Sequence, residues 1–353
     1  MAMPALQRLR EAHPQARITL LTPQKLNDLW TGSPFIDTTF PIVSGENLWS
    51  VAQRLRQGRF DLGLVLPNSP RSALELWFGR VPVRIGYSGS WRDLFLSNVV
   101  QPAAGFVPMH KRSACEIRRL IRSGATSSPP PPSSAHHIHH YLRLAAATGA
   151  SSNPVAPFIP VSEEELMNVR QTLGIPVDLP GKPLLGLNAG AEYGPAKRWP
   201  TENFVATARE VQRRTGAVWV LFGGPGDIPL VTEVERGLRE GGSSPYLGQV
   251  VNLAGRTTLR ELVAALRACR LLLTNDTGPM HVAAAVGTRV VALFGSTSPE
   301  LTGPGLPGDN RHRLLRKDVP CHPCFRRECP IDFRCLRGLS PSIVVDEILQ
   351  AIH

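Results

Sequence analysis

A short polar loop that directly follows an apolar run indicates phosphate-binding chemistry. The run at 271–274 leads into Asn-Asp-Thr-Gly at 275–278, and a proline then marks the first turn of a helix. Small residues at such a junction let backbone N–H groups approach a phosphate, and the helix start adds the positive end of its dipole. His281 follows one turn later. We predict a phosphate site here, with an ordinary helix cap by Asp276 or Thr277 as the alternative.

A second loop carries two positive charges suited to a phosphate leaving group. The apolar run at 184–187 opens into a glycine-rich loop that reaches Lys197 and Arg198. When a diphosphate leaves a sugar, negative charge develops on it, and a fixed cation stabilises that transition state. We predict this role for the loop, with a solvated basic turn as the alternative. The segment at 271–295 contains neither GxGxxG nor a Walker lysine, which disfavours the common dinucleotide and P-loop sites.

Clustered cysteines and histidines raise the question of a metal site. Four thiols in CHPCFRRECPIDFRC could surround a structural zinc ion: Cys321, Cys324, Cys329 and Cys335. Their spacing is not the paired C-x2-C pattern, so reduced structural thiols or a stress disulfide are the alternatives. The histidine-rich run HHIHHYLRL at 136–144 has a single i, i+4 pair and no carboxylate nearby, so we expect a helix start there.

The chain is basic, and the excess lies in its first third. Of 353 residues, 39 are Lys or Arg and 28 are Asp or Glu, which gives a net charge of +11. Residues 1–122 hold 16 of the basic and 8 of the acidic side chains. A positive field of this size favours an anionic partner, which could be a nucleic acid, an anionic membrane or a phosphorylated substrate. The alternative is a solvated basic surface without such a partner. No basic motif interleaved with aromatics supports nucleic-acid binding, so we do not expect it.

The composition favours a soluble, cytoplasmic protein. No apolar run reaches the ~18 residues of a membrane helix, and the first residues lack the layout of a signal peptide. Six cysteines are too few for a disulfide scaffold in a chain of this length.

Strand-like and helix-like stretches alternate along the chain, and they must position both loops. In the first half we expect helices at 6–12, 48–57 and 72–78, and strands at 18–21, 62–66 and 83–86. In the second half we expect strands at 184–187, 218–222, 250–253, 271–274 and 289–294, and helices after 200, at 258–269, near 279 and at 341–352. This alternation predicts two Rossmann-like lobes with parallel sheets that face each other across a cleft.

Stretches rich in proline and glycine divide the chain. We expect the boundary in or between those at 151–160 and 174–183, and we assign 1–175 to an N-terminal lobe and 182–335 to a C-terminal lobe, followed by a closing helix at 340–353. The segment SGATSSPPPPSSA at 123–135 cannot build a packed element, so we expect an exposed loop inserted in the first lobe.

Three segments resemble a known family. NAGAEYGPAKRWP at 188–200 and TNDTGPMHVAAAVGTRVVALFGSTSP at 274–299 together resemble glycosyltransferase family 9, the ADP-heptose:lipopolysaccharide heptosyltransferases. PNSPRSALELWFGRVPVRIGYSGSWRDLFLSN at 67–98 is similar to the acceptor lobe of the heptosyltransferase II members. The resemblance covers nearly the whole chain. It implies a GT-B fold, with the acceptor on the N-terminal lobe and ADP-heptose on the C-terminal lobe.

The same resemblance implies roles for individual residues. Lys197 and Asp276 would be catalytic, and Lys197 would reach the diphosphate or the donor sugar. The other donor contacts would come from Gly224, Asp227, Thr257, Thr258, Thr277, Gly278 and His281. The phosphorylated acceptor would face Asn68, Ser69, Arg71 and Ser72.

The implied reaction is an inverting transfer of L-glycero-D-manno-heptose from ADP-heptose to an inner-core heptose of lipopolysaccharide. No cofactor is expected, because GT-B transferases usually stabilise the leaving group with side chains and a helix dipole. The anionic lipid acceptor would hold the protein at the cytoplasmic face of the inner membrane, against the basic N-terminal lobe. The alternatives are a different nucleotide sugar or acceptor, or an inactive donor-binding pseudoenzyme.

One departure from the family concerns the start of the chain. Family members open with a parallel strand and a Gly-Asp pair before a helix that resembles MAMPALQRLREAHPQA, and that Asp is the expected general base. This sequence begins at Met1, so we expect the strand and the base to be encoded upstream of an assigned start that lies too far downstream. The alternative, a real loss, would expose two strand edges and a large apolar face. For the chain as written we expect little or no transferase activity.

Overall fold

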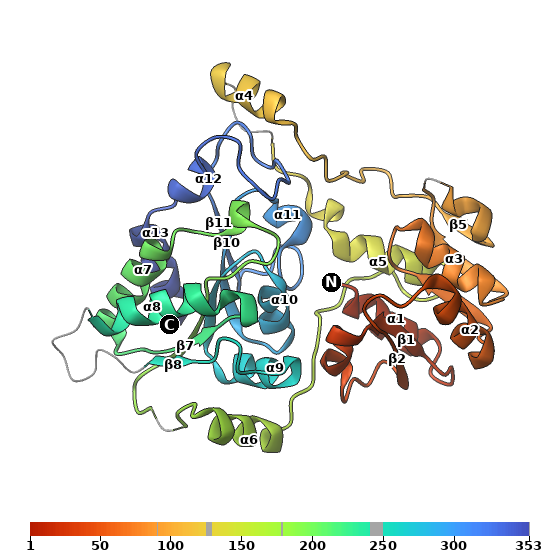
Figure 1. The fold of residues 1–353 in the computed structure, drawn as a ribbon, viewed down its shortest axis with the longest axis horizontal. Coiled ribbons are helices and arrows are strands. Elements are labelled where there is room, and N and C mark those ends of the chain that lie inside the picture. Colours follow the sequence, from red (N-terminus) through yellow and green to blue (C-terminus); the bar gives the residue numbers. More distant parts are fainter. Residues whose placement is uncertain (90, 125–128, 178, 241–249, 353) are drawn as a thin grey trace. The chain divides into compact units, whose positions relative to one another are not determined.

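Two α/β units make up the chain (Figure 1). The computed structural model describes residues 1–352 except 90, 125–128, 178 and 241–249. The first unit consists of Met1–Val107 and Ser134–Pro157, and the second of Pro108–Ser133 and Phe158–His353.

The first unit alternates helices and strands as the sequence predicts. Its elements are α1 (Met3–Ala12), β1 (Thr19–Pro23), η1 (Gln24–Trp30), β2 (Thr38–Ile42), α2 (Leu48–Gly58), β3 (Leu62–Val65), α3 (Pro70–Phe78), β4 (Val83–Tyr87), η2 (Arg92–Phe95), β5 (Asn98–Val100), η3 (Ser133–Ala135) and α5 (His137–Ala146). The strands pair in parallel into two sheets, β1–β2 and β3–β4–β5. Leu21 from the first sheet packs against the same apolar core as Val65 from the second.

Side-chain caps fix where α2 and α3 begin. The Asn47 side chain accepts a hydrogen bond of 2.8 Å from the Ser50 N–H, and the Ser69 hydroxyl accepts one of 3.2 Å from the Ser72 N–H. A proline in the first turn further favours the start of α3. Since each helix follows its strand directly, each helix start lies at the carboxyl end of that strand.

The second unit contains the larger sheet. Its elements are α4 (Ala114–Arg122), α6 (Glu163–Leu173), β6 (Leu184–Asn188), η4 (Pro195–Lys197), α7 (Thr201–Thr215), β7 (Val218–Phe222), η5 (Pro225–Asp227), α8 (Ile228–Glu240), β8 (Val250–Asn252), α9 (Leu259–Ala268), β9 (Leu271–Asn275), α10 (Gly278–Ala285), β10 (Arg289–Phe294), α11 (Pro299–Thr302), β11 (Arg313–Arg316), α12 (Arg334–Arg337) and α13 (Pro341–Ile352). The predicted capping box forms, because Thr258 and Glu261 each accept from the other's backbone N–H at the start of α9.

The strands of this sheet run parallel in the order β11-β10-β9-β6-β7-β8. Within this sheet the first strand along the chain is β6. The next two, β7 and β8, lie on one side of it, and β9 lies on the other side. Every residue of β6, β7 and β9 is buried, as expected for strands covered on both faces. The order reverses between β6 and β9, and in open α/β sheets ligands bind at such a switch point.

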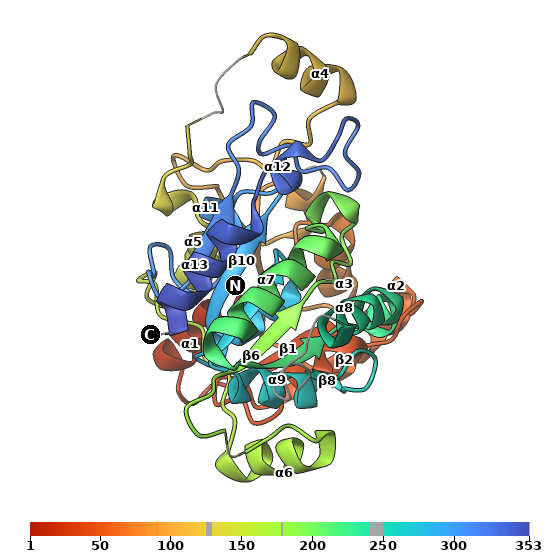
Figure 2. The ribbon, with the colours of Figure 1, turned by 90° about the vertical axis from the view of Figure 1, so that its left-hand side faces the viewer.

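Helices cover both faces of the larger sheet. Alternate strand residues such as Leu187, Leu221 and Leu273 pack with Phe204 and Ile348 in one core beneath α7, α8 and α13. The helices α9 and α10 contact each other, and α6 packs against α9 (Figure 2). No helix within the described residues has the length and apolar character that a bilayer-spanning segment requires.

The chain passes from the first unit to the second after Pro157, inside the predicted stretch 151–160 and before the predicted lobe end at 175, and a further segment is divided differently. The segment Pro108–Ser133, with α4, belongs to the second unit, because Ile117 is buried in that unit's core. The Arg112 N–H also donates to the Cys324 carbonyl at 3.1 Å. The predicted insert at 123–135 therefore joins the two units instead of lying inside the first, and its residues 125–128 lie outside the described part. Five of the basic residues counted toward the first lobe accordingly lie in the second unit: Lys111, Arg112, Arg118, Arg119 and Arg122.

Candidate functional site

The loops that the sequence singles out in the second unit lie at the carboxyl ends of neighbouring strands. The loop with Lys197 follows β6, and the loop with Asp276 follows β9, so both lie at the switch point of the sheet. The segment 295–298 follows β10 on the other side of β9. The parallel sheet thus brings together side chains that are about eighty residues apart in the sequence.

A single buried carboxylate links these three loops. The Lys197 ammonium lies 2.6 Å from Oδ2 of Asp276, and it also donates to the Asp276 carbonyl at 3.4 Å. The Thr297 hydroxyl donates to the same Oδ2 at 2.5 Å. Asp276 is 4% exposed and Thr297 6%, so water competes little for these contacts. The predicted pair of Lys197 and Asp276 is therefore in direct contact in this structure.

The backbone around Lys197 is held by the cysteine-containing segment. The Ala196 N–H donates to the Arg327 carbonyl at 3.0 Å, and the Tyr193 hydroxyl donates to the Phe325 carbonyl at 2.8 Å. Gly194 has φ +141°, and a methyl group there would lie 2.6 Å from the Arg327 carbonyl oxygen. Only glycine fits this turn. Gly194 therefore allows the backbone path that places Lys197.

The start of α10 is left open to a ligand. Thr277 is its N-cap residue, but its side chain accepts no hydrogen bond from the first turn. Its hydroxyl lies instead 3.2 Å from Nδ2 of Asn188 and 3.3 Å from the Thr274 hydroxyl. A methyl group on Gly278 would meet nothing within 4 Å. The ordinary cap considered from the sequence is therefore not formed by Thr277, and His281 lies on the same short helix.

The two loops that carry the predicted donor contacts Gly224, Asp227, Thr257 and Thr258 lie beside each other. The Gly255 N–H donates to the Gly223 carbonyl at 2.9 Å, which joins the turn after β7 to the turn after β8. Asp227 accepts from the Gly224 N–H at 3.1 Å, and a methyl group on Gly190 would collide with its carboxylate. Gly224 is exposed on this turn.

In the second of these loops, Thr257 is half-buried and Thr258 is the exposed cap of α9. The predicted donor residues are thus distributed over consecutive loops at one edge of the sheet.

Two polar residues at this edge were missed by the sequence analysis. Thr297 binds Asp276, and Asn188 donates to the hydroxyls of Thr274 and Thr277 at 3.1 and 3.2 Å. Thr297 follows the predicted strand at 289–294, and Asn188 follows the predicted strand at 184–187. That position, at the carboxyl end of a parallel strand, was the signal that could have identified them.

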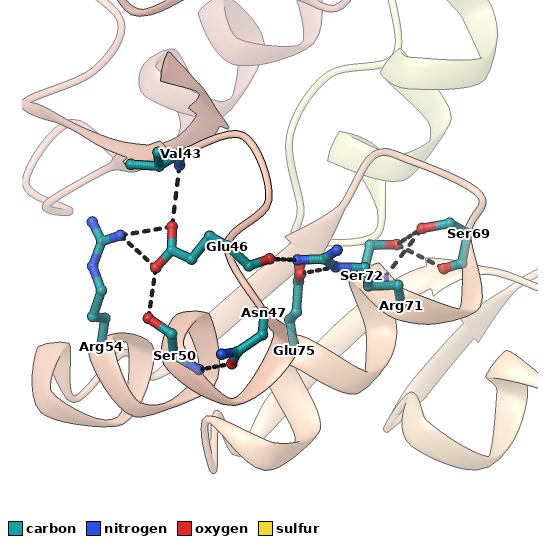
Figure 3. A network of polar contacts seen from close by, with 9 residues as sticks. All are labelled: Val43, Glu46, Asn47, Ser50, Arg54, Ser69, Arg71, Ser72 and Glu75. Atoms are coloured by element: carbon teal, nitrogen blue, oxygen red, sulfur yellow. Dashed lines mark hydrogen bonds and ion pairs between the residues drawn. The ribbon is translucent and has the colours of Figure 1, made fainter.

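The four residues assigned to the acceptor surround the start of α3 in the first unit. Figure 3 shows that three of them are bound to their neighbours: Ser69 and Ser72 to each other, and Arg71 to Glu75 and to the Glu46 carbonyl. The two Arg71 bonds measure 2.7 and 2.6 Å. Asn68, which precedes the N-cap residue, accepts from the Arg92 guanidinium at 3.1 Å.

Glu46 joins the loop after β2 to both helices (Figure 3). Its carboxylate accepts from the Val43 N–H, the Ser50 hydroxyl and Arg54, while its carbonyl accepts from Arg71. These hydrogen bonds hold the pKa of the Glu46 carboxyl below its usual value, with the Arg54 bond contributing most. Arg71 therefore braces α3 against this loop in the present structure.

The structure lends no geometric support to the predicted zinc site. Among the residues it describes, no three His, Cys, Asp or Glu side chains converge so that they could hold a metal ion. Burial and the neighbouring thiols of Cys324 and Cys329 raise the pKa of Cys321 to about 11, and burial likewise raises that of Cys335 to about 12. These two thiols are therefore protonated at neutral pH, and all the described cysteines are free of disulfides. The structural zinc ion stays a prediction.

The histidine-rich run begins a helix, as predicted. His136 caps α5 through its Nδ1, which accepts from the Ile138 N–H at 3.2 Å. The His140 ring stacks on Tyr87 with 3.7 Å between centroids. Two of the histidines thus have structural roles within the first unit.

Fold, switch-point geometry and motifs together define a glycosyltransferase. Residues 48–333 match glycosyltransferase family 9 (heptosyltransferase), and the chain belongs to this family. The predicted α/β fold of the GT-B class with parallel sheets is confirmed.

Named relatives agree with this assignment. The chain is 30% identical to lipopolysaccharide heptosyltransferase 2 of Salmonella typhimurium over 349 residues, which cover 96% of this chain and 91% of that protein. It is similar to the solved structure of an Escherichia coli ADP-heptose lipopolysaccharide heptosyltransferase II, with a TM-score of 0.75, 26% identity and coverage of 99% and 94%. An Escherichia coli heptosyltransferase solved with ADP has the same fold, with a TM-score of 0.68, 15% identity and coverage of 99% and 95%.

Proposed function

We propose that this chain transfers L-glycero-D-manno-heptose from ADP-heptose to an inner-core heptose of lipopolysaccharide, with inversion at the anomeric carbon. The observation that carries the proposal is the contact of Lys197 with buried Asp276 beside the uncapped start of α10. The membership in family 9 and the 30% identity to a heptosyltransferase 2 support the donor and the acceptor class.

In this proposal the donor's diphosphate lies at the start of α10. The bond between the anomeric carbon and the phosphate oxygen breaks as the oxygen of the acceptor hydroxyl bonds to the opposite face of that carbon. The hydroxyl proton passes finally to solvent water, and ADP leaves. Lys197 and the helix dipole neutralise the charge that develops on the leaving diphosphate. Asp276 and Thr297 hold the ammonium in place, since both contacts converge on one carboxylate oxygen. We propose that these groups suffice without a metal ion.

The remaining donor residues flank this centre. We propose that Thr277, Gly278 and His281 contact the diphosphate and heptose end. The turns with Gly224 and Asp227, and with Thr257 and Thr258, would lie along the adenosine. The acceptor is anionic, so we propose that the protein works as a peripheral protein at the cytoplasmic face of the inner membrane.

Transfer can be measured directly by mass spectrometry. Where the acceptor hydroxyl finds a proton acceptor in this chain, incubation with ADP-heptose and a heptose-terminated lipopolysaccharide core adds one heptose to the core and releases ADP, equally with and without EDTA. Where it finds none, ADP-heptose binds but no heptose is transferred, which is the outcome expected of a donor-binding pseudoenzyme. Replacement of ADP-heptose by UDP-glucose is the matched control, and it is expected to give no product. Hexose addition from UDP-glucose would instead identify a family member with a different donor. Dependence on an added metal would contradict the proposal that Lys197 and the helix dipole neutralise the diphosphate without a metal ion.

A further inference from the structure

A second cation lies beside Lys197, on the segment that contains the clustered cysteines. The Arg327 guanidinium lies over the Tyr193 ring, with its Cζ atom 5.2 Å from the ring centroid. The Lys197 ammonium lies 4.9 Å from the centroid of the same ring. Cationic side chains are attracted to the face of an aromatic ring at such distances. One tyrosine ring therefore has two positive charges as neighbours at this edge of the sheet.

Backbone contacts fix Arg327 against two loops of the candidate site. Its carbonyl accepts from the Ala196 N–H at 3.0 Å, in the loop after β6. The Phe325 N–H donates to the Ser296 carbonyl at 2.8 Å, in the loop after β10. The Phe325 carbonyl in turn accepts from the Tyr193 hydroxyl at 2.8 Å. The backbone that carries the Arg327 side chain is thus held by the loops that meet at the candidate donor site.

The two cations differ in how their charge is compensated. The Lys197 ammonium lies 2.6 Å from Oδ2 of Asp276, so it shares its charge with a carboxylate. In the part of the chain that the structure describes, no carboxylate lies within 4 Å of the Arg327 guanidinium, and its side chain is exposed. A guanidinium keeps its charge at any ordinary pH. Arg327 therefore adds an uncompensated positive charge beside Lys197.

Arg198, the other cation that the sequence predicts in this region, has a contact within its own loop. Its Nε donates to the Ala191 carbonyl at 3.2 Å. Arg327 was not selected, because the sequence analysis considered the segment 321–335 only for its cysteines. The structure brings this segment against the loop with Lys197, which no local pattern in the sequence indicates.

A diphosphate beside Lys197 would gain from an uncompensated cation. The diphosphate of a nucleotide sugar is anionic, and its negative charge increases as the nucleoside diphosphate leaves. Pairing with Asp276 reduces the attraction of the Lys197 ammonium for that charge, whereas Arg327 has no carboxylate that offsets its own. A guanidinium also presents N–H groups in a planar fork that matches two phosphate oxygens.

We propose that Arg327 contacts the diphosphate of the nucleotide-sugar donor and stabilises the ADP that leaves. This role rests on the proposed function for the presence of that donor. Tyr193 is the positioning residue, because its ring lies against both cations and its hydroxyl is bound to the segment that carries Arg327.

The substitution Arg327→Gln removes the charge and leaves the backbone contacts of this position in place. Calorimetry with ADP measures the effect. We expect Arg327→Gln to bind ADP about tenfold more weakly than the wild type, and Arg327→Lys, which keeps the charge, to bind it within about threefold. The ADP affinity of the wild type is also expected to fall more steeply with added sodium chloride than that of Arg327→Gln, because the variant has one charge fewer for salt to screen.

Arg267→Gln is the matched control. Arg267 is exposed in the last turn of α9, shortly before β9 begins, so it lies at the opposite edge of the sheet from the candidate site. The substitution removes the same charge and should leave the ADP affinity and its salt dependence at the wild-type values. The melting temperature Tm of each ligand-free protein is recorded as well, and all are expected to agree with the wild type.

The possible results separate a charge role from a structural one. Equal ADP affinities of the wild type and Arg327→Gln would overturn the proposed contact alone. A lower ligand-free Tm of Arg327→Gln, together with a salt dependence parallel to that of the wild type, would assign Arg327 a structural role and would overturn the contact as well. A wild type that does not bind ADP would contradict the proposed function together with this contact.

Discussion

One carboxylate oxygen organises the candidate donor site. Oδ2 of Asp276 accepts from Lys197 and from Thr297, so the position of the ammonium depends on a hydroxyl that belongs to a third loop. A hydrogen bond to a charged group contributes ~1.5–3 kcal/mol. Thr297 thus positions Lys197, because both bind the same oxygen of Asp276.

Replacing Thr297 tests this dependence. Thr297→Val removes the hydroxyl at nearly constant volume, so Asp276 loses one donor and Lys197 is held less firmly. We expect ADP-heptose binding, measured by calorimetry, to weaken about tenfold, or ~1.4 kcal/mol. Thr297→Ser keeps the hydroxyl and is expected to bind within about twofold of the wild type. Equal affinities of the Val and Ser variants would show that the hydroxyl does not position the site.

At the scale of the residue, the sequence predicted the site residues that stand at the centre of its two motifs. Lys197 and Asp276 stand in two long motifs, and the structure brings them together. Asn188 and Thr297 lie near the ends of the same two motifs, but no role was predicted for them. Their contacts form because parallel strands end at one edge of the sheet.

At the scale of the element, the packing of α5 on β4 contains a titratable ring. His140 of α5 stacks on Tyr87 of β4, and the Tyr87 hydroxyl donates to the His140 carbonyl at 2.7 Å. Burial, with a smaller contribution from the nearby His137, lowers the pKa of His140 to about 4. The His140 ring is therefore neutral at neutral pH when the first unit is folded.

This pKa gives the first unit a predictable dependence on pH. The pKa of histidine in an unfolded chain is about 6.5, so between pH 6.5 and 4 the unfolded state binds the extra proton. The contribution of His140 is full above pH 6.5 and is lost as the pH falls toward 4. His140→Phe keeps a ring and removes the titration, so its Tm should fall less over that range than that of the wild type. Parallel Tm curves for the two proteins would contradict this assignment.

The elements themselves were largely predictable, because their signals are local. Alternating apolar runs identified β6, β7, β9 and β10, and the capping box at Thr258 and Glu261 identified the start of α9. The short strands β2 and β5 were not identified. Their residues are half-buried or exposed, so they lack the apolar run that identifies a buried strand.

At the scale of the whole molecule, the number of α/β units and the last crossing between them were predictable. That crossing follows Pro157, inside the proline-rich stretch at 151–160. The assignment of Pro108–Ser133 to the second unit was not predictable. The decisive contact is the burial of Ile117 in the core of that unit, which no local pattern reveals. The basic residues of α4 consequently lie on the unit that carries the candidate donor site.

In the proposed function, the second unit binds ADP-heptose with its diphosphate at the start of α10. Calorimetry with ADP-heptose and with UDP-glucose, on the wild type and on Gly278→Ala, tests it most directly. A methyl group on Gly278 meets nothing within 4 Å in this structure, so the variant should keep the wild-type Tm or exceed it slightly. We expect the wild type to prefer ADP-heptose, and we expect Gly278→Ala to lose at least about tenfold in affinity for it. A wild type that prefers UDP-glucose, or a Gly278→Ala variant that binds ADP-heptose as the wild type does, would contradict it.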